Sequence, residues 1–378
     1  MRLRFGIGLA PIAAVAAIAA GNASAVSSVV GHVYVDDNTA GANTIAAFDR
    51  HADGTLTPMP GSPFAAGGAG TGAGIGSQGA LQITSDGKYL LAADAGSNQI
   101  SVLRIDSDGG LKPVGGGPVS SGGVEPVSIA VHDGLVYVAN AGNGGSNYTG
   151  FTLNPGGHLR PLAGSTVALP DGSTPGDVLF NGDGTRLVGV RVGTSLIDSF
   201  TVGTDGLLTT APGSPIAAQG PGPFGSEFRP TDPTELYVSN AHGGGGAGTV
   251  SAFADGNDGS LTSIGSSPFA DFQTAPCWVE ISHDGQFLFT VNTASNSISR
   301  YTIGSDGSLS LIGSTPLATA GAGAEDARLA PDGQTLWVVE TGAAKLGAFA
   351  VDGGGLTELP SSPTALPAGS APFGIVVT

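Results

Sequence analysis

The chain has 378 residues, of which 40% are apolar and only 11% are charged. Its 30 acidic residues outnumber the 13 basic ones, which gives a formal net charge of −17. An acidic surface of this kind argues against nucleic acid as a partner, because phosphates require a basic footprint. The single cysteine excludes an internal disulfide,, so we expect packing to stabilise the fold.

The first 25 residues have the pattern of a cleaved secretory signal. Arg2 and Arg4 supply a positive start, Ile7–Ala20 is an apolar run, and the "ASA" that ends at Ala25 has the small-x-small pattern of a cleavage site,. We therefore expect a mature domain over residues 26–378 and a secreted protein, either periplasmic or extracellular. The apolar run is shorter than the ~20 residues of a membrane span and no later stretch qualifies, so we expect no membrane span.

The rest of the chain is a sevenfold repeat, in which a glycine turn followed by leucine marks each unit. The markers are spaced about 50 residues apart, the range of propeller blades. Short apolar runs alternate with Asp-Gly turns, the strongest short signal of a β-hairpin. The sequence therefore predicts an all-β fold, a seven-bladed β-propeller of four-stranded antiparallel blades. The marker leucines are Leu56, Leu111, Leu159, Leu208, Leu261, Leu309 and Leu356.

The two ends of the chain hold complementary parts of one blade. The first unit begins with "HVYVDD" at 32–37, which matches the second strands of other units, such as "LVYVAN" at 135–140. The last residues, "PFGIVVT" at 372–378, match first strands such as "PCWVEI" at 276–281. We expect the C-terminal strand to pair into the first blade and close the ring, which removes the open sheet edges that lead to aggregation.

The Asp-Gly turns join strand one to two and strand three to four, so they lie on one face of the ring. The longer loops lie on the other face, and we expect function there, at the mouth of a central channel. At this face the second strands end on Asp or Asn in five units, residues that bond to nearby backbone. Arg191 and Glu340 replace them in two units and are therefore functional candidates.

Neighbouring carboxyls suggest a cation site at the same mouth. Pairing across the turns places Asp177 near Arg191, as a predicted ion pair, and Asp326 near Glu340. The predicted metal ligands are Asp36, Glu325, Asp326 and Glu340, with Asp37 close by. Crowded carboxylate oxygens favour a divalent cation, Ca²⁺ or Mg²⁺, or a raised carboxyl pKa suited to general acid catalysis. A solvated acidic rim is the alternative.

Charged residues on the predicted inner strands complete the candidate site. We expect Arg191 and Arg328 to hold an anionic or carbonyl oxygen, and Glu280 or Glu340 to move a proton. Salt bridges between blades would leave the same pattern. The expected ligand-binding residues are Asp177, Glu227, Arg229 and Trp278.

Over residues 32–378 the chain resembles the seven-bladed β-propeller lactonase family, which includes 6-phosphogluconolactonase-like and carboxymuconate-cyclising members and exported propellers with YVTN repeats. "LVYVANAG" at 135–142, "LYVSNA" at 236–241 and "FTVNTASNSISRYTIGSDGSL" at 289–309 carry the resemblance. It implies a hydrolase or cycloisomerase that acts on a lactone or similar cyclic ester at the channel mouth.

The middle blade departs from the pattern of the 6-phosphogluconolactonase-type enzymes. Their pattern implies two histidines on its first strand, where this chain has Gly176 and Val178, and two aspartates and a basic residue after it, where this chain has Arg191, Ser195 and Leu196. Two function classes therefore stay open. One is an enzyme for a small-molecule lactone, and the other is a non-catalytic secreted propeller that binds a ligand or a cell-surface partner. We expect a monomer in either case.

Overall fold

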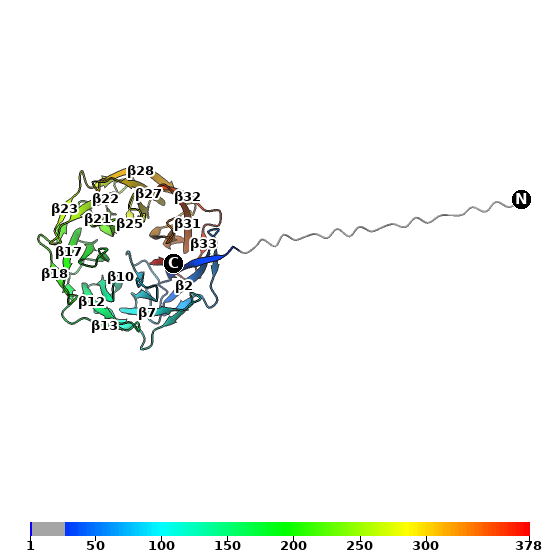
Figure 1. Cartoon of the computed structure of the whole chain (residues 1–378), viewed down its shortest axis with the longest axis horizontal. Coiled ribbons are helices and arrows are strands. Elements are labelled where there is room, and N and C mark those ends of the chain that lie inside the picture. The colour runs from blue at the N-terminus through cyan, green and yellow to red at the C-terminus, as the bar shows by residue number, and fades with distance from the viewer. Residues whose placement is uncertain (2–26) are drawn as a thin grey trace.

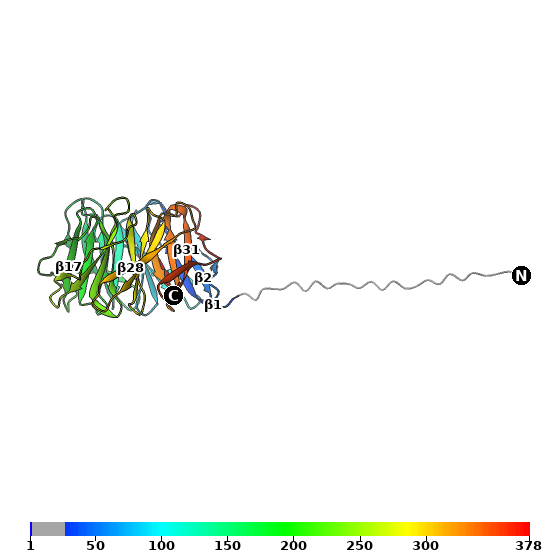
Figure 2. The same ribbon diagram turned by 90° about the horizontal axis from the view of Figure 1, so that it is seen from above.

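Seven antiparallel β-sheets stand side by side around a central axis (Figure 1). The structure is a computed structural model and describes Met1 and residues 27–378. Seen from the side, the strands run from one face of the ring to the other (Figure 2). This confirms the predicted seven-bladed propeller. The predicted signal peptide lies outside the described residues, apart from Met1.

Each blade has an inner, a second, a third and an outer strand. The inner strands are β34 (Ile375–Val377), β5 (Leu81–Ile83), β10 (Pro126–His132), β15 (Pro175–Phe180), β20 (Pro223–Arg229), β25 (Pro276–Ile281) and β29 (Ala324–Leu329). The second strands are β1 (Val29–Asp36), β6 (Tyr89–Asp94), β11 (Leu135–Asn140), β16 (Arg186–Arg191), β21 (Asp232–Asn240), β26 (Phe287–Asn292) and β30 (Thr335–Glu340). The third strands are β2 (Thr44–His51), β7 (Gln99–Ile105), β12 (Asn147–Leu153), β17 (Leu196–Val202), β22 (Thr249–Asp255), β27 (Ser297–Ile303) and β31 (Lys345–Asp352).

The outer strand is broken in six blades, where the sequence predicted one continuous strand. Its first piece is β3 (Leu56–Pro58), β8 (Leu111–Pro113), β13 (Leu159–Pro161), β18 (Leu208–Thr210), β23 (Leu261–Ser263) or β32 (Gly355–Glu358), and blade six has the single long strand β28 (Leu309–Pro316). The second piece is β4 (Phe64–Ala65), β9 (Val119–Ser120), β14 (Val167–Ala168), β19 (Ile216–Ala217), β24 (Phe269–Ala270) or β33 (Thr364–Ala365). Both pieces pair with the third strand.

A recurring Ser-Pro pair accompanies this break. In the first blade the Ser62 hydroxyl accepts the N–H of Ala47 on the third strand (2.9 Å), and Ser267 does the same for Ala252 (2.7 Å) in the fifth. The serine therefore satisfies a backbone donor that the interrupted outer strand leaves open.

The C-terminal strand closes the ring as predicted. β34 pairs antiparallel with β1, with Val377 opposite Val33 and Ile375 opposite Val35. It also contacts β29 on one side and β5 on the other, so the two chain ends complete the first blade. The C-terminus consequently lies on the inner side of the ring (Figure 1).

Apolar side chains fill the spaces between blades, because each sheet is covered on both faces by its neighbours. Tyrosines in the second strands add a polar contact. The hydroxyls of Tyr34, Tyr137 and Tyr237 each donate to a glycine carbonyl in the next blade, at 2.8, 2.8 and 2.9 Å. These bonds satisfy the buried hydroxyls. The only helix in the described chain is the 3-10 turn η1 (Thr341–Ala343), and nothing within these residues is a helix long and apolar enough to cross a membrane.

Candidate functional site

The inner strands are linked by side chains that reach forward to the next blade. Ser128 accepts the N–H of Val178 (3.1 Å), and Asp177 accepts the N–H and the hydroxyl of Ser226 (3.0 and 2.6 Å). These residues lie about one repeat apart. Because the inner strand has no neighbour in its own sheet on the axial side, its free backbone donors need such partners.

Two glutamates make the same contact at a deeper level of the strands. Glu227 accepts the N–H of Ile281 (3.0 Å), and Glu280 accepts the N–H of Leu329 (2.8 Å). Glu227 pairs with Tyr237 and Glu280 pairs with Phe289 on the neighbouring second strand. Tyr237 and Phe289 both lie three residues before the end of that strand. Each glutamate thus joins its blade to the next one through a backbone hydrogen bond.

Arg328 adds a positive charge beside these two glutamates. Its guanidinium lies 3.1 Å from Glu280, and the Arg328 side chain is 28% exposed whereas that of Glu280 is 4% exposed. Glu227 is also only half-buried. Solvent therefore reaches an ion pair that is surrounded by protein at the centre of the ring. We call Asp177, Glu227, Glu280, Asp326 and Arg328 the central cluster.

The central cluster shifts the protonation of its members. Burial holds the pKa of Glu227 well above its usual range, and the negative charge of Glu280 raises it further. The positive charge of Arg328 opposes this shift,. Burial also raises the pKa of Glu280, which Arg328 opposes. Burial alone would lower the pKa of Arg328, but the charges of Glu280 and Glu227 raise it overall, so the guanidinium stays charged.

The two aspartates of the cluster lie one level higher. Burial raises the pKa of Asp177 to about 7, against the hydrogen bonds from Ser226 and Ser128. Burial likewise raises the pKa of Asp326 well above its usual range, with Arg328 opposing and Glu280 adding to the shift. The backbone N–H groups of Gly374 and Ala327 oppose the shift of the Asp326 pKa.

The 66–80 connector, which joins the first blade to the second, crosses the centre of the ring. The Gln78 side chain donates to the carbonyls of Ser226 (3.0 Å) and Val279 (3.3 Å) and accepts the N–H of Val279 (3.3 Å). Its own N–H donates to the carbonyl of Gly176 (2.8 Å). The connector is thus tied to the inner strands of blades four, five and six, directly above the glutamates of the central cluster.

Sequence reasoning did not find this role of the connector. The stretch "GIGSQG" at 74–79 is followed by a strand and lies between two blades, so it is identifiable as a connector. Its path depends on contacts far along the chain. Asn38 fixes the other end, because its side chain accepts the N–H of Thr71 (2.8 Å) and donates to the carbonyl of Ala73 (2.7 Å).

The predicted ion pair between Asp177 and Arg191 is wrong. Asp177 does lie opposite Val190, as expected, but the Arg191 Nε donates to Asp198 (2.6 Å), which also accepts the hydroxyl of Tyr148 (3.0 Å). Arg191 ends the second strand of blade four, as Asn140 does in blade three. Asn140 likewise bonds to the residue seven places later, Asn147, at 2.8 Å. In the structure Arg191 is paired with Asp198 and lies outside the central cluster.

Two predicted ligand-binding residues also point elsewhere. Arg229 reaches toward the sixth blade, as Glu227 does, but its guanidinium is bound near the turn, where it donates to the carbonyl of Gly285 (2.8 Å) and to Glu235 (2.9 Å). Trp278 is fully buried, and its Nε1 donates to the carbonyl of Ala327 (3.0 Å). Both residues join adjacent elements of the ring.

The carboxylates predicted to bind a metal are dispersed. Asp36 accepts the N–H of Asn38 (2.9 Å), and Asp326 lies in the central cluster. Glu325 lies near Cys277 of blade six, where its negative charge contributes to the raised pKa of the thiol. Glu340 lies opposite Lys345. Asn140 and Arg191, at the same position of their blades, bond to the residue seven places later, but for Glu340 that residue is Gly347 and has no side chain. Among residues 27–378, no three His, Cys, Asp or Glu side chains are grouped so as to hold a metal ion.

The family described as "Lactonase, 7-bladed beta-propeller" matches residues 41–163 and 228–376 of the chain. The matched residues cover well over half of the sequence. The stretch between the two matched segments contains blade four, where Gly176 and Val178 stand in place of the histidines of the 6-phosphogluconolactonase pattern. A search of curated protein sequences gave no significant match.

Solved structures share the fold over nearly the whole chain. A protein of Bacteroides uniformis, provisionally assigned as a 6-phosphogluconolactonase, superposes with a TM-score of 0.73 at 20% identity and covers 92% of this chain and 99% of its own. The periplasmic gluconolactonase PpgL of Pseudomonas aeruginosa gives 0.73 at 18% identity, with 92% and 99% covered. A Lactobacillus plantarum protein gives 0.72 at 20%, also with 92% and 99% covered. Likeness at these identities establishes the fold alone.

Proposed function

The chain belongs to the lactonase family of seven-bladed β-propellers, and from this premise we propose that it hydrolyses a lactone or similar cyclic ester at the central cluster. The observation that carries the proposal is the partly exposed guanidinium of Arg328, 3.1 Å from the buried carboxylate of Glu280 and close to the half-buried Glu227. A fixed positive charge can stabilise the oxyanion of ester hydrolysis, and two carboxyls beside it can accept and donate the protons of that reaction.

The roles follow from the protonation of the cluster. Arg328 stays charged and stabilises the oxyanion that forms when water adds to the lactone carbonyl. Glu280, whose carboxylate form is favoured by the guanidinium of Arg328 at 3.1 Å, accepts the proton of that water. Glu227, whose pKa lies well above its usual range because of burial, donates a proton to the ring oxygen as the C–O bond breaks. The product is the open-chain hydroxy acid, and no step uses a metal.

The charge of the cluster favours an uncharged lactone as the substrate. Four carboxyl groups surround the single guanidinium, so the site has no excess of positive charge to attract a phosphate. The missing histidines at Gly176 and Val178 agree with this preference. We therefore propose a neutral lactone, and not a phosphorylated one, as the substrate class.

Hydrolysis of neutral five- and six-membered lactones, followed in a pH-stat, tests the proposal. Arg328→Lys removes the guanidinium and is expected to lower kcat by about 10²–10³. Glu227→Gln removes the proton donor and is expected to lower kcat by about 10² or more. Arg229→Lys is the matched control, because this arginine is bound to Glu235, and it is expected to keep full activity. Equal activity in all three variants would refute the site.

A non-catalytic, ligand-binding propeller is the second candidate, and the 66–80 connector favours it. Gln78 lies above the glutamates and bonds to two inner strands. It therefore narrows the path by which a substrate could reach the central cluster from that face. This candidate predicts no hydrolysis of any lactone by the folded protein.

We also propose export, because the first 25 residues carry the signal pattern. The mass of the protein recovered outside the cytoplasm tests this, since cleavage after Ala25 leaves a chain that begins at Val26. A chain that keeps Met1 would contradict it.

A further inference from the structure

Among residues 27–378 of this acidic protein, the exposed positive charges gather on two adjacent blades. Lys88, Arg104 and Lys112 lie on blade two, and Arg160 lies on blade three. The other seven Lys and Arg residues within 27–378 are buried or half-buried. In a chain with a net charge of −17, such segregation points to an anionic ligand at this part of the outer rim.

A groove between blades two and three brings two of these cations together. Tyr89 lies directly opposite Arg104, and Arg104 directly opposite Lys112, so the three side chains share one face of the sheet. The turn that carries Gly156 and His158 forms the facing wall, and the Tyr89 hydroxyl donates to Pro155 of that turn (3.0 Å). The groove encloses about 550 Å³, within the usual size of ligand pockets.

The repeat shows that these cations are exceptions. The position of Arg104 in the other blades is occupied by Asp49, Thr152, Thr201, Ala254, Thr302 and Ala350. The position of Lys112 is occupied by Thr57, Arg160, Thr209, Thr262, Ser310 and Thr357. Blade two alone has a cation in both positions, and the blade architecture does not require either one. Residues that break a repeat without serving its packing are candidates for function.

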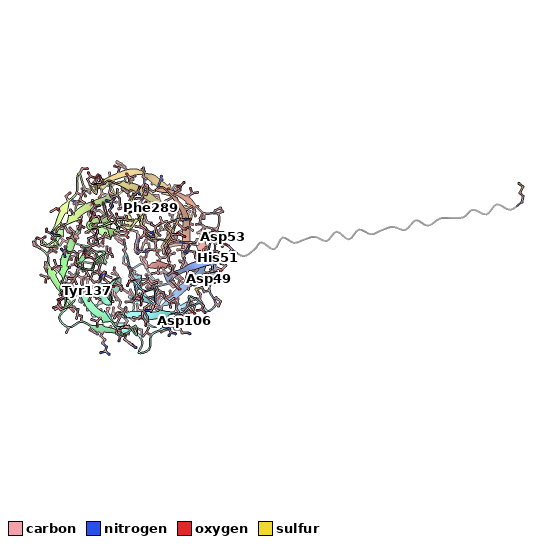
Figure 3. The ribbon with its side chains drawn as sticks, in the orientation of Figure 1. Asp49, His51, Asp53, Asp106, Tyr137 and Phe289 are labelled. Carbon is pink, nitrogen blue, oxygen red and sulfur yellow. The ribbon has the colours of Figure 1, made fainter. Side chains whose placement is uncertain are left out.

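The charges of the groove do not cancel. Asp106, at the outer edge of the ring (Figure 3), lies 2.8 Å from Arg104 and 2.6 Å from Lys112. One carboxylate thus faces two cations, and no acidic residue lines the groove itself. One positive charge remains, held on side chains that are 55% and 67% exposed.

An apolar slot continues from the charged end of the groove. It encloses about 180 Å³ and shares Val114 and His158 with the groove, and Val102, Val119 and Leu159 line the rest. The glycines at 115–117 leave its rim open, because an added Cβ at any of them would meet no atom within 4 Å. A ligand can therefore place an anionic group at one end and a compact body at the other.

We propose that this groove binds the oxyanion group, carboxylate or phosphate, of a sugar-sized small molecule. Arg104 and Lys112 bind the oxyanion through charge-assisted hydrogen bonds, and the slot accommodates the body of the ligand. The groove lies on the outer strands, whereas the central cluster lies on the inner ones, so this site goes beyond the proposed hydrolysis.

Calorimetric titration of the full-length folded protein tests the proposal with glucuronate as the carboxylate, glucose 6-phosphate as the phosphate and glucose as the neutral probe. We expect saturable binding of at least one anion and none of glucose. Arg104→Gln/Lys112→Gln is expected to weaken binding by about tenfold or more, since each charged hydrogen bond contributes substantially. Lys88→Gln/Arg160→Gln removes the same number of exposed charges outside the groove and is the matched control.

The result that supports the site is a large loss in the groove variant and a loss of less than about twofold in the control, with both variants melting within a few degrees of the wild type. The carboxylate and phosphate arms then show which oxyanion the groove prefers. Binding that is absent for both anions, that is as strong for glucose, or that falls equally in the two double variants would overturn the proposal, because a diffuse charge effect gives the last result.

Discussion

Phe373→Ala tests whether the C-terminal segment holds the ring together. Phe373 is fully buried, and its N–H donates to the carbonyl of Asp36 (2.9 Å). Its ring lies against the 66–80 connector, since a Cβ added at Gly74 would be 3.5 Å from the ring. This residue therefore joins the closing segment to the first blade through its backbone and to the connector through its ring, and the substitution removes only the ring.

The expected loss is a large part of the total stability. Truncation of a buried phenylalanine costs about 3–5 kcal/mol, against a total of about 5–15 kcal/mol for a typical protein. Removal of residues 373–378 would also delete the buried side chains of Ile375 and Val376, which are 1% and 4% exposed and whose burial contributes about 1.5–3 kcal/mol each. That sum approaches the entire free energy of unfolding, so we expect the truncated chain not to fold.

Urea unfolding provides the measurement, with tryptophan fluorescence and circular dichroism as parallel probes. Phe272→Ala is the control, because this side chain is 70% exposed and its loss should change stability by no more than about 0.5 kcal/mol. A loss below about 1 kcal/mol for Phe373→Ala, or a truncated chain with the wild-type melting curve, would refute closure by the C-terminal strand.

Three further predictions concern the backbone, pH and a structural ion pair. Gly374→Ala should lower the melting temperature more than Gly369→Ala. Both glycines have positive φ, but only at Gly374 would an added Cβ meet the backbone N of β5, at 2.5 Å,. Equal shifts of the melting temperature would contradict this reason. Burial raises the pKa of Asp177 and of Glu325 to about 7, so the folded state binds more protons than the unfolded state between about pH 4 and 7 and stability should fall as pH rises through this window; a urea midpoint that is higher at pH 8 than at pH 5 would contradict the shifts. Arg191→Ala leaves its buried aspartate partner uncompensated and should cost about 3–5 kcal/mol without a change in kcat for lactones, and a drop in kcat with unchanged stability would restore Arg191 as a catalytic residue.

The fold was predictable because the repeat records it seven times. The glycine turns gave the number of blades, and the match between the two chain ends gave the closure. The break in the outer strand was less visible, because it depends on a serine hydroxyl replacing a backbone partner on the third strand.

The candidate site was only partly predictable, since its contacts run between blades. The sequence identified Glu227, Glu280 and Arg328 as unusual charges on inner strands, and the structure brings them together. It could not show that Arg191 pairs with Asp198, because that choice depends on side-chain direction across the second and third strands. The role of Gln78 depends on contacts about 150 and 200 residues away, which no local pattern reveals.

Chemical rescue of Arg328→Ala tests the central claim most directly. The variant leaves room for a guanidinium ion beside Glu280, so hydrolysis of a neutral lactone should fall by about 10² or more and recover in part when guanidinium is added below the concentrations that unfold the protein. The same addition should leave the wild type unchanged. Wild-type protein that hydrolyses no lactone, or an Arg328→Ala variant that remains fully active without guanidinium, would contradict the account.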